Sequence, residues 1–158
     1  MLIINFIAGM SCVGKSYYIE NCKAANDEII DLFKYQQENR DYLNAEYLFY
    51  SQIERTLRRA KDSNSTIWIE VPFYKRYRRK AVVSFFKTIA EGFGSNVEWN
   101  LTYIQASQDR YLKNIKLRFP DCSHEDGLKY YKTRLENVEV PTLEETIDGW
   151  NKVEIVSL

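Results

Sequence analysis

Residues 9–16 read Gly-Met-Ser-Cys-Val-Gly-Lys-Ser, and this short stretch constrains the fold more than any other part of the chain. Its spacing matches G-x-x-x-x-G-K-[ST], the pattern of a phosphate-binding loop. Such a loop requires a strand before it and a helix after it. The apolar run at residues 2–7 is typical of a buried parallel strand, and residues 16–25 are expected to form a helix.

The residue types in this loop suit an anionic ligand. The glycines let the backbone turn so that successive N–H groups face one anion, and the helix that follows directs the positive end of its dipole to the same place. Lys15 would add a mobile charge for the outer phosphates, and Ser16 a hydroxyl for Mg²⁺. The residues expected to contact a nucleotide are Gly9, Ser11, Cys12, Val13, Gly14, Lys15, Ser16 and Tyr17.

Length and composition describe an ordinary globular chain. The 158 residues suffice for one domain with a real core, so we expect residues 1–158 to form a single domain. The 22 basic and 22 acidic residues give a formal net charge of zero, so a nucleic-acid role would need a local basic patch. Three cysteines without a C-x-x-C pair and a single histidine argue against a zinc site or a disulfide framework, and favour a cytoplasmic location.

Strand and helix patterns alternate along the rest of the chain. We expect further strands at residues 28–31, 66–72, 97–104 and 153–156. We expect helices at residues 44–61 and 81–89, and two more in a lid at about residues 107–137. Residues 34–43 are expected to form a substrate-side loop, and Thr142 to open a short helix through a capping box. The alternation predicts an α/β fold in three layers, with a mostly parallel five-stranded sheet, helices on both faces and a helical lid.

Two carboxylates are expected at the carboxyl edge of this sheet, where open α/β sheets bind ligands. Asp31 ends the second strand and could take a proton from an acceptor hydroxyl, or could simply cap a turn. Lys34 could bind an anion of the acceptor or remain a solvated lysine. Glu70 ends the third strand and could hold Mg²⁺, bind the acceptor, or be structural.

Residues 75–80, the basic segment, hold five of the 22 basic residues. They lie at or before a helix N-terminus, where positive charge is unfavourable, so stability alone does not explain them. Tyr74 and Tyr77 could stack on bases beside them. We therefore expect Arg76 and Arg79 to bind substrate; the alternative is a solvated helix start.

The second group of basic residues lies in the lid, just after the fourth strand. Its members are Arg110, Lys113, Lys116 and Arg118. A helix that carries them could close over the ligand and neutralise charge on a transferred phosphoryl group, with Arg110 on the nucleotide. The alternative is a charged face turned to solvent.

Taken in order, these features resemble the small P-loop kinases grouped around phage-type polynucleotide kinase and its "predicted kinase" relatives. The resemblance covers nearly the whole chain. The loop at 9–16 and the strand at 66–72 match the family directly. Residues 31–34 are similar to the family's D-x-x-R motif, residues 111–118 to its R-N-x-x-R lid, and residues 131–142 to its closing R-x-x-x-E-x-P-x-x-E segment.

The resemblance implies a P-loop NTPase fold of the nucleotide-kinase type and assigns roles to four residues. Asp31 would activate a hydroxyl, and Lys34 would contact an acceptor phosphate. Lys113 and Lys116 would take the catalytic arginine positions of the lid. Lysine thus replaces arginine at three positions, and lysine cannot clamp a phosphate bidentately.

The expected activity is that of a kinase that uses ATP and Mg²⁺ and transfers the γ-phosphoryl group to a hydroxyl, most simply a polynucleotide 5′-hydroxyl or a nucleotide-like acceptor. The basic segment favours nucleic acid, whereas the neutral net charge favours a small metabolite. A non-catalytic ATP-binding module is the other alternative. A GTPase is not indicated, because residues 151–154 read Asn-Lys-Val-Glu where guanine recognition uses N-K-x-D, and no D-x-x-G follows the third strand.

Overall fold

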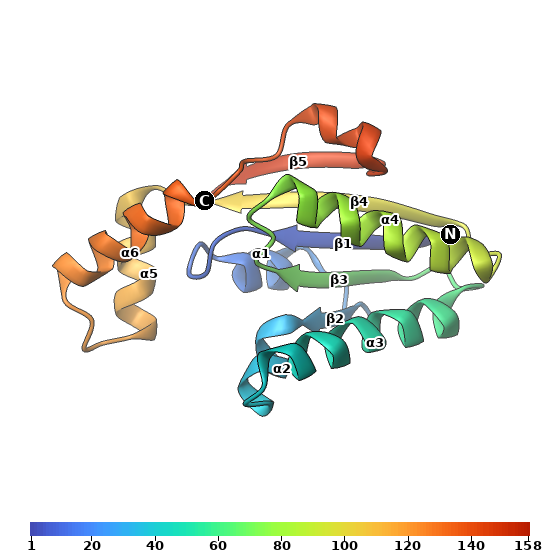
Figure 1. Ribbon diagram of the computed structural model, residues 1–158, viewed down its shortest axis with the longest axis horizontal. Coiled ribbons are helices and arrows are strands. Elements are labelled where there is room, and N and C mark those ends of the chain that lie inside the picture. Colours follow the sequence, from blue (N-terminus) through green and yellow to red (C-terminus); the bar gives the residue numbers. More distant parts are fainter.

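The computed structural model describes residues 1–158 and contains one five-stranded sheet (Figure 1). Its strands are β1 (Leu2–Ala8), β2 (Glu28–Asp31), β3 (Thr66–Val71), β4 (Val97–Gln105) and β5 (Lys152–Ser157). They lie in the order β2-β3-β1-β4-β5, and every neighbouring pair is parallel. The strand before the phosphate-binding loop is therefore central, and the chain leaves it to one side for β2 and β3 and to the other for β4 and β5. Ligands bind at such a switch point, beyond the carboxyl ends of the strands.

The larger part of the core lies between the sheet and helices α3 (Tyr42–Ala60) and α4 (Arg76–Gly92), which cover one face in Figure 1. Leu2, Ile4 and Phe6 of β1 alternate with residues of the opposite face and are fully buried in this layer. Phe49 and Phe86 meet them from α3 and α4. The helical periodicity of the apolar residues in both helices explains why one stripe of each faces the sheet.

The opposite face carries α1 (Lys15–Cys22), which lies behind the sheet in Figure 1. Helices α5 (Gln108–Arg118) and α6 (His124–Glu136) form the lid beyond the carboxyl ends of the strands. Ile7 of β1, Val13 of the loop and Tyr111 and Ile115 of α5 share a smaller apolar cluster. This cluster fixes the lid against the phosphate-binding loop. None of the helices combines the length and the hydropathy needed to span a bilayer.

The prediction of a substrate-side loop at residues 34–43 is wrong, because helix α2 (Leu32–Glu38) occupies half of this segment and α3 begins at Tyr42. The Asp31 carboxylate accepts a hydrogen bond from the Phe33 N–H at 2.9 Å and thereby caps this helix. Leu32 is buried, and the Tyr35 ring packs on Phe49 of α3 with centroids 6.0 Å apart. The polar composition of the segment concealed a short helix that is stabilised by its cap and by tertiary packing.

The capping box expected at Thr142 is also wrong. The segment Leu143–Asp148 is a 3₁₀ helix, η1, and the Thr142 side chain makes no capping hydrogen bond. Gly149 ends η1 with a φ of 118°, a left-handed conformation that favours glycine. The Glu145 side chain, which a capping box would turn back to Thr142, instead points to α4 and pairs with a buried arginine.

Candidate active site

The phosphate-binding loop joins β1 to α1 and has the backbone that its glycines predict. Gly9 and Gly14 have φ angles of 144° and 105°, and Cys12 is the one other residue of the loop in the left-handed region, at 64°. A Cβ at Gly9 would lie 2.4 Å from the carbonyl oxygen of Ile104, so only glycine fits between β1 and β4. Gly14 precedes the first turn of α1 and leaves that helix N-terminus facing the cavity.

Lys15 lies over its own loop. Its ammonium group donates hydrogen bonds to the carbonyl oxygens of Gly9 at 3.0 Å and Met10 at 2.9 Å, and lies 3.9 Å from Glu70 Oε1. The side chain is only 8% exposed, and this burial lowers its pKa, which the negative charges of Glu70 and Asp31 partly oppose. The ammonium group is thus held where an anion in the loop would meet it.

Ser16 and Glu70 form the second contact between the loop and β3. The Ser16 hydroxyl donates to Glu70 Oε2 at 2.9 Å. Burial raises the pKa of Glu70, against the effect of Lys15. Hydroxyl and carboxylate oxygens are hard donors, and Mg²⁺ is usually held by one or two carboxylates together with substrate phosphates. Ser16 and Glu70 therefore fit the role of Mg²⁺ ligands.

Asp31 lies beside Glu70, because the two residues are register partners in the pairing of β2 with β3. Register partners on parallel strands project to the same face of a sheet. The capping role considered for Asp31 is present, since one oxygen caps α2, and the side chain also lines the cavity above the loop, so the role of proton acceptor stays a prediction. Its negative charge contributes to the raised pKa of Glu70.

These groups line one cavity of about 620 Å³ at the carboxyl edge of the sheet. The loop, the ends of β2 and β3, the start of α2 and both lid helices form its walls. Of the site residues expected from the sequence, those that line it are Ser11, Cys12, Gly14, Lys15, Ser16, Tyr17, Asp31, Glu70 and Arg110. Gly9 and Val13 are buried parts of the same loop. The other cavity residues are Leu32, Phe33, Gln36, Tyr42, Val71, Pro72, Tyr74, Asn114, Arg118, Phe119 and Arg134.

One face of lid helix α5 points into the cavity. Arg110, Asn114 and Arg118 follow one another at four-residue spacing and line it together. The Asn114 amide donates to the Cys12 carbonyl at 2.8 Å, which links the lid to the phosphate-binding loop. The Arg118 guanidinium lies 4.3 Å from the centroid of the Phe33 ring, across the cavity on α2.

The lysines that the family resemblance selected in the lid are placed elsewhere. Lys113 is exposed and does not line the cavity. The Lys116 ammonium donates to the carbonyls of Pro120 and Cys122 at the end of α5, which is a structural role. The residues of α5 that line the cavity are Arg110 and Arg118, in place of these two lysines. The four-residue spacing of the arginines was a signal in the sequence, but only the docking of α5 shows which face points inward.

Lys34 is not brought to the cavity either. It lies in a neighbouring hollow of about 210 Å³, whose wall also includes Glu28, Asp31, Tyr35 and Glu38. Lys34 is one turn further along α2 than Asp31, which lines both the hollow and the large cavity. Lys34 does not line the large cavity, and its expected contact with an acceptor anion stays a prediction.

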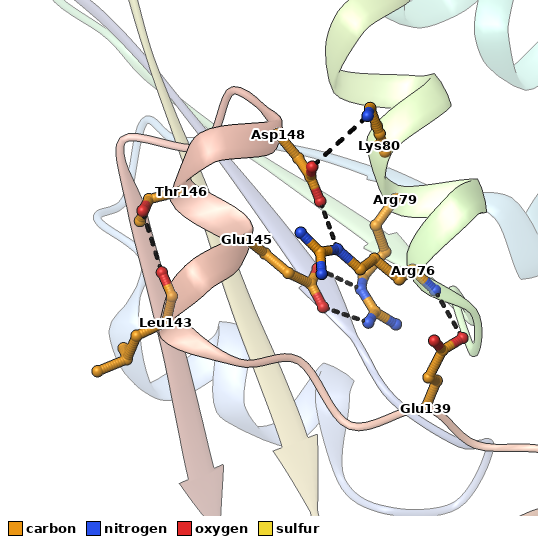
Figure 2. Close-up of polar contacts among 8 residues, drawn as sticks. All are labelled: Arg76, Arg79, Lys80, Glu139, Leu143, Glu145, Thr146 and Asp148. Atoms are coloured by element: carbon orange, nitrogen blue, oxygen red, sulfur yellow. Dashed lines mark hydrogen bonds and ion pairs between the residues drawn. The ribbon is translucent and has the colours of Figure 1, made fainter.

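The basic segment is neutralised by carboxylates from distant parts of the chain (Figure 2). Arg79 is 0% exposed and makes two hydrogen bonds to the Glu145 carboxylate, at 2.9 and 2.6 Å. Arg76 pairs with Asp148 at 2.7 Å, and Lys80 lies 3.8 Å from the same carboxylate. The remaining pair joins Arg78 to Glu46 of α3 at 2.9 Å.

Four of the five cations of this segment thus hold η1 and α3 against α4. The expectation that Arg76 and Arg79 bind substrate is corrected on this ground, because neither lines the cavity and both already have a carboxylate partner. The reason that stability alone did not explain the segment is that its partners lie far away in sequence; Arg79 and Glu145 are 66 residues apart.

Residues that sequence reasoning missed at the site come from α2, the start of α3, the end of α5 and α6. Phe33, Tyr42 and Phe119 give the cavity an aromatic wall, and Arg134 adds a cation from α6. Arg134 lay within the tail that resembles the kinase family, but without an assigned role. No local pattern marks these residues, because their meeting depends on how the lid and α2 pack.

Comparisons with known proteins bear on the fold. No protein-family model matches the chain, and no curated protein matches its sequence. Solved structures match over nearly its whole length. A proposed kinase from Chloroflexus aurantiacus has a TM-score of 0.70 at 13% identity, over 98% of this chain and 87% of that one.

Two further structures give the same result. A sugar kinase from Janibacter sp. HTCC2649 has a TM-score of 0.57 at 10% identity, over 99% of this chain and 86% of the other. A gluconokinase from Sinorhizobium meliloti 1021 has a TM-score of 0.52 at 17% identity, over 97% and 81%. The narrower resemblance to phage-type polynucleotide kinase stays a prediction. Identities this low speak to the fold alone, and the fold is the one expected, that of the P-loop NTPases of the kinase type.

Proposed function

We propose that this protein is a kinase that transfers the γ-phosphoryl group of ATP to a hydroxyl of a small acceptor. The observation that carries the proposal is the single cavity in which the Asp31 and Glu70 carboxylates face the Lys15 loop. Phosphoryl transfer needs a phosphate cradle, a cation for the charge of the transferred group, and a carboxylate beside the attacking hydroxyl. All three are within this cavity.

The phosphate-binding loop and the lid would hold the nucleotide. Backbone N–H groups of the loop and the N-terminus of α1 face the phosphates, and Lys15 exchanges its two carbonyl partners for phosphate oxygens. Arg110 and Arg118 approach from α5 and supply planar guanidinium groups that can bind phosphate oxygens bidentately. A guanidinium placed at the γ-phosphoryl group stabilises the charge of the transition state.

Asp31 is the proposed base. It accepts a single hydrogen bond, from the Phe33 N–H, so one carboxylate oxygen remains for the acceptor hydroxyl. As the hydroxyl oxygen bonds to the γ-phosphorus, the bond from that phosphorus to the β–γ bridging oxygen breaks, ADP leaves, and Asp31 takes the hydroxyl proton. Helix α2 holds the carboxylate in place because the same side chain is its cap.

Mg²⁺ would be held by Ser16 and Glu70, whose oxygen atoms already lie 2.9 Å apart. When bound, the ion neutralises phosphate charge and orients the β- and γ-phosphoryl oxygens. Glu70 must be ionised for this role. Its raised pKa reflects burial, which a cation beside the carboxylate would offset.

A small acceptor fits better than a polynucleotide. The cavity of about 620 Å³ is in the range of small-molecule sites, and it must also accept the triphosphate end of ATP. The basic segment, which favoured nucleic acid, is already paired with carboxylates. The names of the sugar kinase and the gluconokinase of similar fold are consistent with a small hydroxylated acceptor.

The test is transfer from γ-labelled ATP with Mg²⁺ to a pool of nucleosides, nucleotides, sugars and sugar acids, with a 5′-hydroxyl oligonucleotide assayed separately. We expect label in the small-molecule pool. Asp31→Asn should still bind ATP and lose transfer by about 10² or more. Glu38→Gln, an exposed carboxylate at the end of the same helix, is the matched control and should transfer normally.

Two outcomes would contradict the proposal. Label on the oligonucleotide alone would show that the acceptor is a nucleic acid and not a small molecule. ATP binding without transfer to any acceptor would favour a non-catalytic nucleotide-binding module. Lys15→Ala should abolish stabilisation by ATP in either case, because the phosphate-binding loop is common to both functions.

A further inference from the structure

We propose that the acceptor carries an anionic group besides its hydroxyl, and that Arg134 of α6, held by Tyr74, binds this group. The proposal rests on the proposed function for the identity of the acceptor. It adds a charge requirement and a specificity residue, and it replaces Lys34 as the expected anion contact by a residue that lines the cavity.

Arg134 is a cation without a carboxylate partner. Its guanidinium lines the cavity and donates one long hydrogen bond, of 3.4 Å, to the Tyr74 hydroxyl. It takes part in none of the ion pairs of the structure, whereas four of the five cations in the basic segment are paired. A guanidinium has five N–H donors, and a neutral phenol satisfies one of them without balancing the charge. An anion in the cavity would accept hydrogen bonds from the remaining N–H groups and balance the charge.

The position of Arg134 is set by the end of β3. Tyr74 follows that strand, whose register partner β2 ends at Asp31. The Glu139 N–H donates to the Tyr74 carbonyl at 2.8 Å, so the chain after α6 is tied to the chain after β3. Arg134 is therefore anchored on the side of the cavity where β2 and β3 end, which is the side of the proposed base.

Tyr111 of α5 adds a second observation. Its hydroxyl is fully buried and has no hydrogen-bond partner, although buried polar groups are normally bonded. Arg134 and Tyr74 both lie close enough to influence its pKa, which burial raises, so the hydroxyl stays protonated. Tyr111 does not itself line the cavity, so Arg134 and Tyr74 are the polar groups that this wall presents to a ligand, and no carboxylate pairs with either of them.

Arg118 and Arg134 line the cavity from different positions. The Arg118 guanidinium lies 4.3 Å from the centroid of the Phe33 ring on α2, whereas the Arg134 guanidinium is bonded to Tyr74 after β3. This division leaves Arg134 for a second anion. Guanidinium groups bind phosphate and carboxylate bidentately, so the acceptor is a hydroxylated phosphomonoester or a hydroxylated carboxylate.

The experiment measures binding of a second anion when the nucleotide site is full. The protein is saturated with a non-hydrolysable ATP analogue and Mg²⁺, and inorganic phosphate is titrated by calorimetry, with acetate in a parallel arm. We expect saturable binding of at least one anion. Phosphate alone would indicate a phosphomonoester acceptor, and acetate alone a carboxylate.

Four variants locate that anion. Arg134→Gln should weaken its binding at least tenfold, and Arg134→Lys should weaken it less. Tyr74→Phe, which removes only the hydroxyl that positions the guanidinium, should have a smaller effect than Arg134→Gln. Lys132→Gln removes an exposed charge from the same helix and is the matched control, with no effect expected.

The proposal is overturned if the nucleotide-saturated protein binds neither anion, if Arg134→Gln binds as tightly as the wild type, or if Lys132→Gln weakens binding equally. Because no transfer is needed, the result is independent of the activity assay. Arg134-dependent anion binding without transfer to any acceptor would refute the kinase and retain the anion site. Once an acceptor is known, Arg134→Gln should raise the KM of that acceptor and leave the KM of ATP unchanged.

Discussion

Replacement of Glu145 by alanine removes the one carboxylate that pairs with Arg79. The two side chains are 2% and 0% exposed, so water does not replace the lost partner. Arg79 then retains only its hydrogen bond to the Phe73 carbonyl, at 3.2 Å, which does not balance its charge. The variant therefore leaves an uncompensated charge between α4 and η1 (Figure 2).

The size of the effect follows from this geometry. Breaking a buried ion pair by removing one partner costs about 3–5 kcal/mol. A domain of this kind has about 5–15 kcal/mol of stability in all. For a chain of this length each kcal/mol lowers the melting temperature by about 2–4 °C, so the variant should melt about 6–20 °C below the wild type.

Urea unfolding followed by tryptophan fluorescence measures the effect. Glu54→Ala breaks an exposed pair with Arg58 one turn along α3 and is the control, with an expected cost of about 0.3–0.5 kcal/mol. The double variant Arg79→Met with Glu145→Leu should recover most of the loss, because an apolar pair can replace a buried ion pair. A Glu145→Ala protein as stable as the wild type would refute the structural role of this pair and reopen a ligand-binding role for the basic segment.

Two further variants test the site. Arg118→Gln should lower the rate of phosphoryl transfer by about 10² or more at unchanged fold stability. Lys113→Gln, on the outer face of the same helix, should transfer normally. Equal losses in steady-state rate would favour Lys113 as a catalytic residue of the lid, as the family resemblance implies. Burial raises the pKa of Glu70 above its ordinary value of 4.5, and only the ionised carboxylate can hold Mg²⁺, so binding must release a proton below that pKa. The affinity for ATP with Mg²⁺ should therefore weaken on acidification more steeply in the wild type than in Glu70→Gln, in which only the phosphate groups still titrate. Identical pH profiles of the two proteins in calorimetry would remove Glu70 as the ligand.

The phosphate-binding loop could be read from the sequence because it is contiguous. Its glycines, Lys15 and Ser16 lie within eight residues, so their geometry depends on backbone conformations that neighbouring residues determine. The buried strands could be predicted as well, since an apolar run flanked by turns is typical of a strand inside a covered sheet. Asp31 and Glu70 followed from the rule that parallel strands end at one edge.

Helix α2 and the inner face of the lid could not be predicted from the sequence in this way. Residues 34–43 are polar, and the helix there depends on the Asp31 cap and on the packing of Tyr35 against α3. In the lid, periodicity placed the basic residues on a helix, but the choice of Arg118 over Lys116 depends on how α5 docks against the phosphate-binding loop.

The phosphate-binding loop, the parallel sheet and the two carboxylates at its edge could all be predicted from the amino-acid sequence, because each follows from residues that are adjacent in the chain or from a rule of sheet topology. Which basic residues are available to a ligand became evident only from the packing of the folded chain. Arg79 and Arg134 look alike in a sequence, yet one is buried against Glu145, 66 residues away, and the other faces the cavity without a carboxylate. The physical reason is that the availability of a charge depends on which distant carboxylates the fold brings to it.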